Sequence, residues 1–173
     1  MTIRVAVLTI SDRSARGERP DLSGPALSAL IQGQGWQLTQ YGVIPDDFEI
    51  IRDTLIEYCD RDLADILLTT GGTGFAPRDV TPEATLAAME KNAPGLAEAM
   101  RLESLKVTPH AMLSRAAAGI RGRTLVINLP GSPKAAVENL AVIIPVLPHA
   151  VELLRDNPDA EQGHNAAQPR KTG

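Results

Sequence analysis

Short apolar runs recur along the chain, separated by longer segments in which apolar and polar residues alternate at helical spacing. Each run has the length and the β-branched or apolar content of a strand. Ala64–Thr70 is mostly apolar, as expected for a strand that is covered on both faces of a sheet. The predicted strands are Ile3–Ile10, Trp36–Ile44, Ala64–Thr70 and Thr124–Leu129.

The segments between these runs predict helices. In Leu22–Gln34 the apolar residues fall on one face, and Gly35 ends the helix. Strands that alternate with helices from end to end predict a three-layer α/β/α domain with a mainly parallel sheet. The further predicted helices are a segment that turns Phe48, Ile51, Leu55 and Tyr58 inward, then Thr81–Lys91, Pro94–Lys106, Ala135–Ile144 and Leu147–Leu154.

The length of 173 residues suggests one domain with a sizeable core, which we place at residues 1–155. Residues 156–173 lose the apolar periodicity and gather proline, glycine, glutamine, asparagine and charge, which predicts a mobile C-terminal tail. Pro145 and Pro148 are expected to interrupt the last helical stretch of the domain.

Composition narrows the range of partners. A net charge of −4 gives no electrostatic reason to expect binding to nucleic acid or to an anionic membrane. No apolar run is expected to reach the length that a bilayer requires, and no signal peptide is expected before the first strand, so we expect a cytoplasmic protein. The single cysteine, Cys59, excludes an internal disulfide and is interpreted as a structural thiol.

A glycine-rich loop follows the strand that ends at residue 70. It contains Gly71, Gly72 and Gly74, and glycine lets a ligand approach the backbone closely. Thr81 is the expected N-cap of the next helix, with Pro82 at its first position. A strand end, a glycine loop and a nearby helix N-terminus favour an anion-binding site. The alternative is a tight turn between strand and helix, without a ligand.

Two common phosphate-binding loops do not fit this segment. The dinucleotide fingerprint requires a third glycine or alanine where this chain has Pro77. The P-loop requires a Gly-Lys pair, which the sequence lacks. A phosphate site at this loop would therefore belong to neither class.

Two aspartates near the loop each allow a structural and a functional interpretation. Asp46 stands at capping-box spacing from Glu49, so it could be a helix N-cap. The alternative is that Asp46 or Asp47 helps to hold Mg²⁺, which prefers carboxylate oxygens, and the residues alone leave both open. Asp79 lies on the loop, where its charge beside phosphate-binding amides favours a bridging metal ion. The alternative for Asp79 is a salt bridge with Arg78.

Polar residues at the first strand end are expected to meet this loop. Ser11, Asp12 and Arg13 follow the first strand, and ligands bind at the carboxyl ends of parallel strands. The alternative is a turn initiated by the aspartate, with surface charges.

The last strand also leads into a loop and a helix. Ser132 is the expected N-cap, with Pro133 at the first helical position. Lys134 lies in the first turn, where the helix dipole disfavours a cation unless a phosphate is bound.

Together these motifs resemble the signature of the molybdenum-cofactor biosynthesis proteins, and within them the small, single-domain, bacterial-type molybdopterin adenylyltransferases. The resemblance covers roughly residues 3–155 and implies the molybdopterin-binding fold. It is carried by Ser11–Arg13, Ile44–Asp46, Thr69–Gly74, Arg78–Thr85, Leu113–Arg115 and Asn128–Lys134.

The resemblance implies a reaction in which the terminal phosphate of molybdopterin attacks the α-phosphate of ATP, giving adenylyl-molybdopterin and pyrophosphate. It implies Mg²⁺ as the cofactor, with Asp46 and Asp79 as the catalytic carboxylates linked to it. It assigns Ser114 and Arg115 to the substrate, although by residue type alone both would be ordinary surface residues. The residues it assigns to nucleotide or phosphate are Ser11, Asp12, Arg13, Gly71, Gly72, Thr73, Gly74, Asn128, Gly131, Ser132 and Lys134.

The resemblance also implies a homotrimer and a molybdate-inserting enzyme as the downstream partner. Two other functions stay open at this point. One is a molybdate-inserting relative, which usually carries extra domains that this chain is too short to hold. The other is a non-catalytic molybdopterin-binding or assembly protein that keeps the fold.

Overall fold

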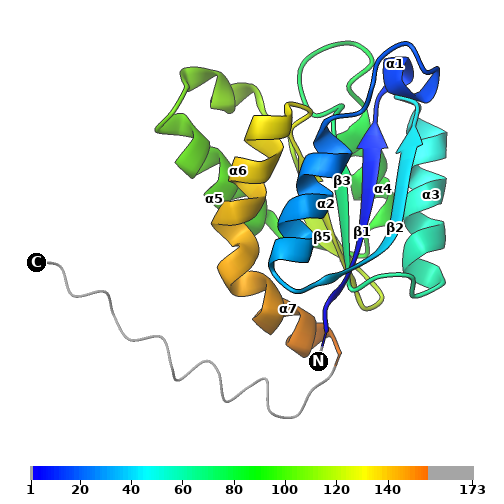
Figure 1. The fold of residues 1–173 in the computed structure, drawn as a ribbon, viewed down its shortest axis with the longest axis vertical. Coiled ribbons are helices and arrows are strands. Elements are labelled where there is room, and N and C mark those ends of the chain that lie inside the picture. Colours follow the sequence, from blue (N-terminus) through cyan, green and yellow to red (C-terminus); the bar gives the residue numbers. More distant parts are fainter. Residues whose placement is uncertain (1, 156–173) are drawn as a thin grey trace, which may run out of the picture.

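The computed structural model describes residues 2–155 and shows a single sheet with helices on both of its faces (Figure 1). The sheet order is β2-β1-β3-β6-β5-β4. Strands β2, β1, β3 and β6 are parallel, whereas β5 runs antiparallel to both of its neighbours. This confirms the predicted mainly parallel sheet. The strands are β1 (Arg4–Ile10), β2 (Gln37–Ile44), β3 (Ile66–Thr70), β4 (Lys91–Asn92), β5 (Ala118–Arg121) and β6 (Thr124–Leu129).

The helices cover the two faces of the sheet unequally. Helices α2, α5, α6 and α7 contribute to one hydrophobic cluster, and α3 and α4 contribute to the other. The expected tail, 156–173, lies outside the described residues. The helical elements are α1 (Asp12–Ala15), α2 (Ser23–Gly33), α3 (Phe48–Asp60), α4 (Thr81–Ala88), α5 (Pro94–Leu105), α6 (Pro133–Ile143) and α7 (Leu147–Leu154), with 3-10 turns η1 (Pro109–Leu113) and η2 (Ile144–Val146).

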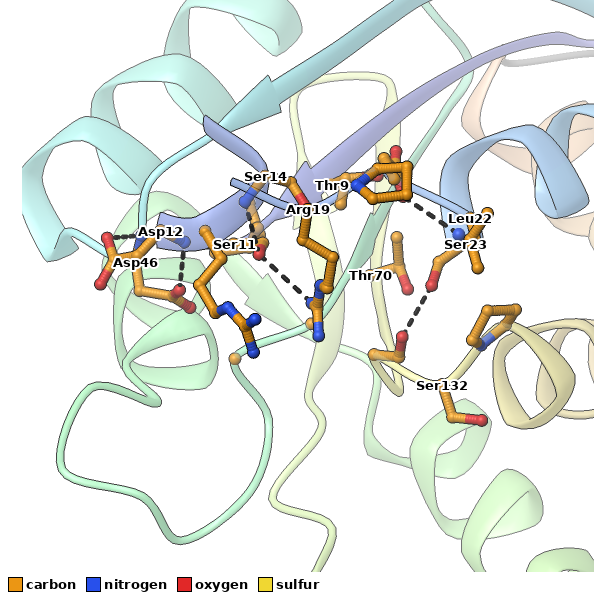
Figure 2. A pocket seen from close by; sticks show the side chains of 18 of the residues that line it. Thr9, Ser11, Asp12, Ser14, Arg19, Leu22, Ser23, Asp46, Thr70 and Ser132 are labelled. Atoms are coloured by element: carbon orange, nitrogen blue, oxygen red, sulfur yellow. Dashed lines mark hydrogen bonds between the residues drawn. The ribbon is translucent and has the colours of Figure 1, made fainter. Parts of the chain in front are cut away.

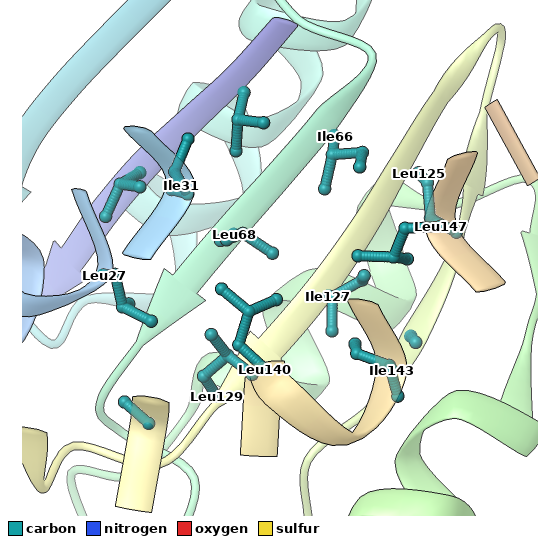
Figure 3. Close-up of a cluster of buried hydrophobic side chains, with 14 of the residues drawn as sticks. Leu27, Ile31, Ile66, Leu68, Leu125, Ile127, Leu129, Leu140, Ile143 and Leu147 are labelled. Carbon is teal, nitrogen blue, oxygen red and sulfur yellow. The ribbon is translucent and has the colours of Figure 1, made fainter. Parts of the chain in front are cut away.

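The central strands are buried on both faces, which accounts for their continuous apolar sequence. Successive side chains of a strand point to opposite faces. In β1, Val5 and Val7 therefore join the first cluster, while Ala6 and Leu8 join the second. Figure 3 shows the first cluster, which includes the buried side chains Leu27, Ile31, Ile66, Leu68, Leu125, Ile127, Leu129, Leu140, Ile143 and Leu147.

One helical run is longer and more apolar than the sequence led us to expect. Pro133–Leu154 spans 22 residues with a mean hydropathy of 1.5, enough by length and composition to cross a membrane. The expectation that no run reaches this length was therefore wrong. However, Leu140, Ile143 and Leu147 in this run are buried in the core, and a core helix passes the same test. The 3-10 turn η2 contains Pro145 and separates α6 from α7, as Pro145 predicted, whereas Pro148 lies in the first turn of α7 and does not interrupt it.

The structure corrects the predicted helix at Thr81–Lys91. Helix α4 ends at Ala88, and Lys91 belongs to the short edge strand β4. Thr81 is the first helical residue, whereas Val80 holds the N-cap position, so the prediction of Thr81 as N-cap was wrong. The main chain of Thr81 instead donates a hydrogen bond to the carbonyl of Gly72, which ties the start of α4 to the glycine loop.

Candidate active site

A cavity of about 660 Å³ opens at the carboxyl ends of β1 and β3. Strand β1 lies between β2 on one side and β3 on the other, so the chain reverses its direction of travel across the sheet at this point. Ligands of open α/β sheets bind at such switch points. The lining comes from residues 9–14, 19–23, 70–72 and 131–133, together with Asp46 and Asp79.

Figure 2 shows that the cavity has two chemically different ends. Asp12 and Asp46 lie at one end, and Ser23 and Ser132 lie at the other. The Ser23 hydroxyl donates to the carbonyl of Gly131 at 2.6 Å, which joins the start of α2 to the loop after β6. An acidic end and a hydroxyl-lined end thus share one cavity.

Gly71 allows three strand ends to come together. Its φ is +105°, and a Cβ at this position would lie 2.3 Å from the carbonyl oxygen of Ile10. Its amide donates to the carbonyl of Leu129, and a Cβ on Gly131 would lie 3.3 Å from the Gly71 Cα. Because side chains are excluded at this contact, the loops after β1, β3 and β6 can pack backbone to backbone.

Gly72 and Gly74 each face a carboxylate. A Cβ on Gly72 would lie 3.0 Å from Asp46 Oδ1, and a Cβ on Gly74 would lie 2.8 Å from Asp79 Oδ2. The two glycines therefore leave the space that the two carboxylates occupy. The glycine loop and the two aspartates predicted as catalytic residues are parts of one arrangement.

Asp46 is not the N-cap of the helix that follows it. The cap of α3 is Asp47, whose carboxylate accepts hydrogen bonds from the amides of Glu49 and Ile50. Asp46 Oδ2 instead accepts from the amide of Asp12 at 2.8 Å, and Asp12 Oδ1 accepts from the amide of Asp46 at 3.1 Å. The capping-box interpretation of Asp46 was therefore wrong, because the neighbouring aspartate fills that role.

The surroundings of Asp46 disfavour its negative charge. Burial raises the pKa of this carboxyl, and the negative charges of Asp12 and Asp79 raise it further, against the hydrogen bond from the Asp12 amide. The guanidinium of Arg78 lies nearest to Asp12, with Nε–Oδ2 and Nη2–Oδ1 distances of 3.0 and 2.9 Å, and it lowers the pKa of Asp12. Arg78 thus forms its ion pair with Asp12, while the charges of Asp12 and Asp79 both act on Asp46.

Asp79 closes the turn of the glycine loop. Its Oδ2 accepts from the amide of Ala76 at 2.9 Å, and its own amide donates to the Ala76 carbonyl at the same distance. Arg78 pairs with Asp12, so the alternative of an Arg78–Asp79 salt bridge was wrong. Asp79 has a local structural contact, and it also lines the cavity.

The donor set fits a hard cation that is shared with a phosphate. Within residues 2–155 no group of three or more His, Cys, Asp or Glu could hold a metal ion by itself. Mg²⁺ is usually bound by one or two carboxylates together with phosphate oxygens and water, rather than by a complete protein cage. Asp46 and Asp79 provide such a pair. The pKa of Asp46 is raised first by burial and then by the charges of Asp12 and Asp79, and a bound cation would favour its charged form.

Arg115 lies behind the glycine loop, outside the lining of the cavity. Its Nε donates to the carbonyl of Gly74 at 2.7 Å, and its Nη2 donates to the carbonyl of Asp79 at 2.5 Å. Its Nη1 pairs with Glu83, and its amide donates to the carbonyl of Thr73. One arginine thereby fixes both ends of the segment that carries Asp79.

Ser114, Thr73 and Asn128 also lie outside the lining. The Ser114 carbonyl accepts from Arg101, and Thr73 is buried. Asn128 is fully buried; its amide group donates to the hydroxyls of Thr69 and Thr85. These residues support the loops from beneath.

The remaining predicted residues differ in their positions. Ser11, Asp12 and Arg13 line the cavity, as do Gly131 and Ser132. Ser132 holds the N-cap position of α6, as predicted, although its side chain makes no capping hydrogen bond. Lys134 lies outside the lining; its side chain is 81% exposed and lies 3.8 Å from Glu138.

The sequence interpretation missed the segment before α2. Asp21 accepts hydrogen bonds from the amides of Ser23 and Gly24 and from the hydroxyls of Thr9 and Tyr41. It thereby fixes the wall of the cavity that also contains Arg19 and Ser23. An aspartate just before a predicted helix was the available signal, because such residues commonly cap helices.

Comparison with known proteins agrees with this architecture. The profile of a family described as "Probable molybdopterin binding domain" matches residues 6–149. The chain belongs to this family.

Among its relatives, the molybdopterin adenylyltransferase of Helicobacter pylori strain J99 is 43% identical over 158 residues, 90% of either chain. Gephyrin of Dictyostelium discoideum is 46% identical over 164 residues, which cover 89% of this chain but only 23% of gephyrin. The crystal structure of the molybdopterin biosynthesis enzyme MoaB from Thermus thermophilus has a TM-score of 0.85 and 48% identity, and the match covers 91% of this chain and 99% of MoaB. The predicted fold class is therefore confirmed.

Proposed function

We propose that this protein catalyses the adenylylation of molybdopterin in molybdenum-cofactor biosynthesis, with ATP as the second substrate and pyrophosphate as the other product. The proposal rests on the positions of two carboxylates at the switch point of the sheet. The Asp46 carboxylate lies beside Gly72, and the Asp79 carboxylate lies beside Gly74. Membership of the family and the similarity to the Helicobacter pylori enzyme support the same reaction.

The cavity provides the groups that a nucleotide triphosphate requires. The amide of Gly72 and the loop Ser11–Arg13 approach the phosphates from two strand ends, and Gly131 and Ser132 close the opposite side. Lys134 follows the lining residue Pro133 and supplies a positive charge at the rim.

The reaction joins two anionic groups, so positioning and charge neutralisation provide most of the catalysis. A terminal phosphate oxygen of molybdopterin forms a bond to the α-phosphorus of ATP. The bond from that phosphorus to the bridging oxygen breaks, and pyrophosphate leaves with the electron pair. Mg²⁺, when bound, would neutralise charge on the phosphate oxygens. Asp46 and Asp79 would hold the ion, and the loop amides would orient the phosphates.

We assign Arg115 to the loop rather than to the substrate. Its three polar contacts with Gly74, Asp79 and Glu83 occupy the guanidinium, and it lies away from the cavity lining. In this assignment Arg115 keeps Asp79 at a fixed distance from Asp46. Ser114 supports the same segment through its carbonyl contact with Arg101.

We also propose a cytoplasmic homotrimer that passes its product to a molybdate-inserting enzyme. Large apolar side chains are exposed on α5 and on the segment up to the end of η1, and such patches favour subunit contacts. They include Leu102, Leu105, Val107, Met112 and Leu113. Gephyrin contains a domain similar to this chain as a minor part of its length, which supports a functional link to a further domain or protein.

The test is incubation of the purified protein with molybdopterin and Mg-ATP, followed by chromatography for adenylyl-molybdopterin and an assay for pyrophosphate. We expect both products in equal amounts. Binding of molybdopterin without either product would instead identify a non-catalytic binding protein. In a second incubation with molybdate added, consumption of molybdate without an adenylylated intermediate would identify a molybdate-inserting relative.

A further inference from the structure

The hydroxyl of Thr81 is fully buried and has no hydrogen-bond partner within residues 2–155. The residue itself is well fixed, because its amide donates to the carbonyl of Gly72 at 3.1 Å and it forms the first position of α4. Buried hydroxyls normally have a partner, and an exception calls for an explanation such as a role in another state of the site.

Four other buried threonines around the same strands are paired. Thr69 and Thr85 accept hydrogen bonds from Asn128. Thr70 donates to the carbonyl of Pro130, and Thr124 donates to the carbonyl of Ala64. Thr81 is therefore distinguished from its neighbours by its contacts, although it shares their burial.

The unpaired hydroxyl lies beside the carboxylate of Asp46. A Cβ on Gly72 would stand 2.3 Å from Thr81 Oγ1 and 3.0 Å from Asp46 Oδ1, so the two oxygens approach one point above the glycine. Asp46 is held at its other oxygen, because Oδ2 accepts from the amide of Asp12. Because Gly72 has no side chain, no Cβ atom stands between the Thr81 hydroxyl and the Asp46 carboxylate.

We propose that Thr81 is a positioning residue for Asp46. In the liganded protein its hydroxyl donates a hydrogen bond to Asp46 Oδ1 across Gly72 and fixes the direction in which that carboxylate faces Mg²⁺ and phosphate. This inference rests on the proposed function. The inference adds Thr81 to the site: its hydroxyl stays without a partner until the Asp46 carboxylate turns toward the ligand.

The experiment compares Thr81→Val, which removes the hydroxyl at nearly constant volume, with Thr81→Ser, which keeps it. Thr85→Val is the matched control, since its hydroxyl accepts a hydrogen bond from Asn128 in the structure. Each protein is measured by thermal unfolding and by calorimetric titration of Mg²⁺ in the presence of a non-cleavable α,β-methylene analogue of ATP. Turnover with molybdopterin and ATP is measured as kcat and KM.

We expect Thr81→Val to melt at or above the wild-type temperature, because removing an unpaired buried hydroxyl relieves its desolvation cost. Its Mg²⁺ affinity should fall about tenfold, the effect of losing one hydrogen bond to a charged group, with the loss of turnover in kcat rather than in KM for ATP. Thr81→Ser should retain the wild-type affinity and kcat. Thr85→Val should melt at a lower temperature because it leaves the Asn128 amide short of a partner.

Two outcomes would overturn the inference. One is wild-type Mg²⁺ affinity and kcat in Thr81→Val. The other is a melting temperature that falls as in Thr85→Val, because the hydroxyl would then be structural. If the wild-type protein forms no adenylyl-molybdopterin, the proposed function fails, whereas the Mg²⁺ titration with the ATP analogue still decides the role of Thr81.

Discussion

A buried or partly buried aspartate lies at each end of the parallel strands, and the surroundings shift the pKa values of the two in opposite directions. Asp65 precedes β3 at the amino end of the sheet and is only 3% exposed. It accepts hydrogen bonds from Arg155 and from both the amide and the guanidinium of Arg4. Burial alone would raise its pKa, but these hydrogen bonds outweigh burial and the pKa is lowered.

Asp46 follows β2 at the carboxyl end and lies close to two further acidic groups. Burial and the charges of Asp12 and Asp79 raise its pKa. In Figure 1, α7 lies at one end of the molecule and α1 at the other. The comparison suggests that charge is balanced within the protein where the fold needs it, and is left unbalanced where a cationic ligand is expected.

The largest effect should come from the balanced end. Asp65→Asn removes the buried carboxylate that Arg4 and Arg155 share and leaves Arg4 only the exposed Asp62. Removal of one partner of a buried ion pair is strongly destabilising. We expect the free energy of unfolding in urea to fall by about 3 kcal/mol, with product formation by the folded protein unchanged. Asp62→Asn is the control, since its side chain is 67% exposed and such pairs contribute little. Equal effects of the two substitutions would contradict the comparison.

The next effect should be on chemistry at the unbalanced end. Asp79→Asn keeps an oxygen that can accept from the Ala76 amide, so the loop turn should hold and the melting temperature should change little. Product formation should fall by at least about 100-fold, the scale of losing one preorganised electrostatic contact. The Mg²⁺ midpoint of the reaction should also rise.

Asp53→Asn is the matched control for Asp79→Asn. Asp53 is an exposed aspartate on α3 that pairs with Arg52, away from the cavity. It should leave both rate and midpoint unchanged. If Asp79→Asn also leaves them unchanged, the carboxylate serves only the turn at Ala76, and the metal-binding role is lost.

These positions also show how far the sequence could predict the fold. The central strands were predicted within two residues at each end, because strands buried on both faces have continuous apolar sequences. The edge strand β4 and its neighbour β5 were missed. Lys91–Asn92 is short, polar and exposed, so its pairing with β5 leaves no apolar pattern to read.

The candidate site was predictable where backbone chemistry dictates the residue type. The glycine loop and Asp79 share one sequence segment, and they do lie together on the cavity. The sequence offered Asp46 as the helix cap, whereas Asp47 provides it, because adjacent carboxylates have the same local options. The position of the Arg115 side chain behind the loop depends on contacts with Gly74 and Glu83, which are distant in sequence and cannot be predicted from the residues around Arg115.

A smaller effect should appear when the charge of Asp46 is removed. Asp46→Asn keeps an acceptor for the Asp12 amide but removes a disfavoured charge, so at pH 7 we expect stability to rise by about 1 kcal/mol. Product formation should fall, because the carboxylate oxygen of a proposed Mg²⁺ ligand is lost. Urea unfolding and the product assay measure the two effects. Asp47→Asn is the control, since asparagine caps helices about as well as aspartate, and it should change neither.

The smallest and most discriminating effect should be seen in pH dependence. The stability differences of Asp65→Asn and Asp46→Asn from wild type should change in different pH ranges. The pKa of Asp65 is lowered below the ordinary 3.8, so its stabilising contribution is complete above 3.8 and is lost as pH falls through the folded value. The pKa of Asp46 is raised above 3.8, so its destabilising contribution is absent below 3.8 and develops as pH rises through the folded value.

Urea unfolding of wild type, Asp65→Asn and Asp46→Asn between pH 3 and pH 7 separates these two contributions. On acidification, the advantage of Asp46→Asn should shrink first, at pH values above 3.8, because wild-type Asp46 takes up its proton there. The deficit of Asp65→Asn should persist to lower pH and shrink only below 3.8. If both stability differences changed on the same side of pH 3.8, the pKa values of Asp46 and Asp65 would not be shifted in opposite directions. The carboxyl end of the sheet would then have no excess negative charge for a cationic ligand to balance.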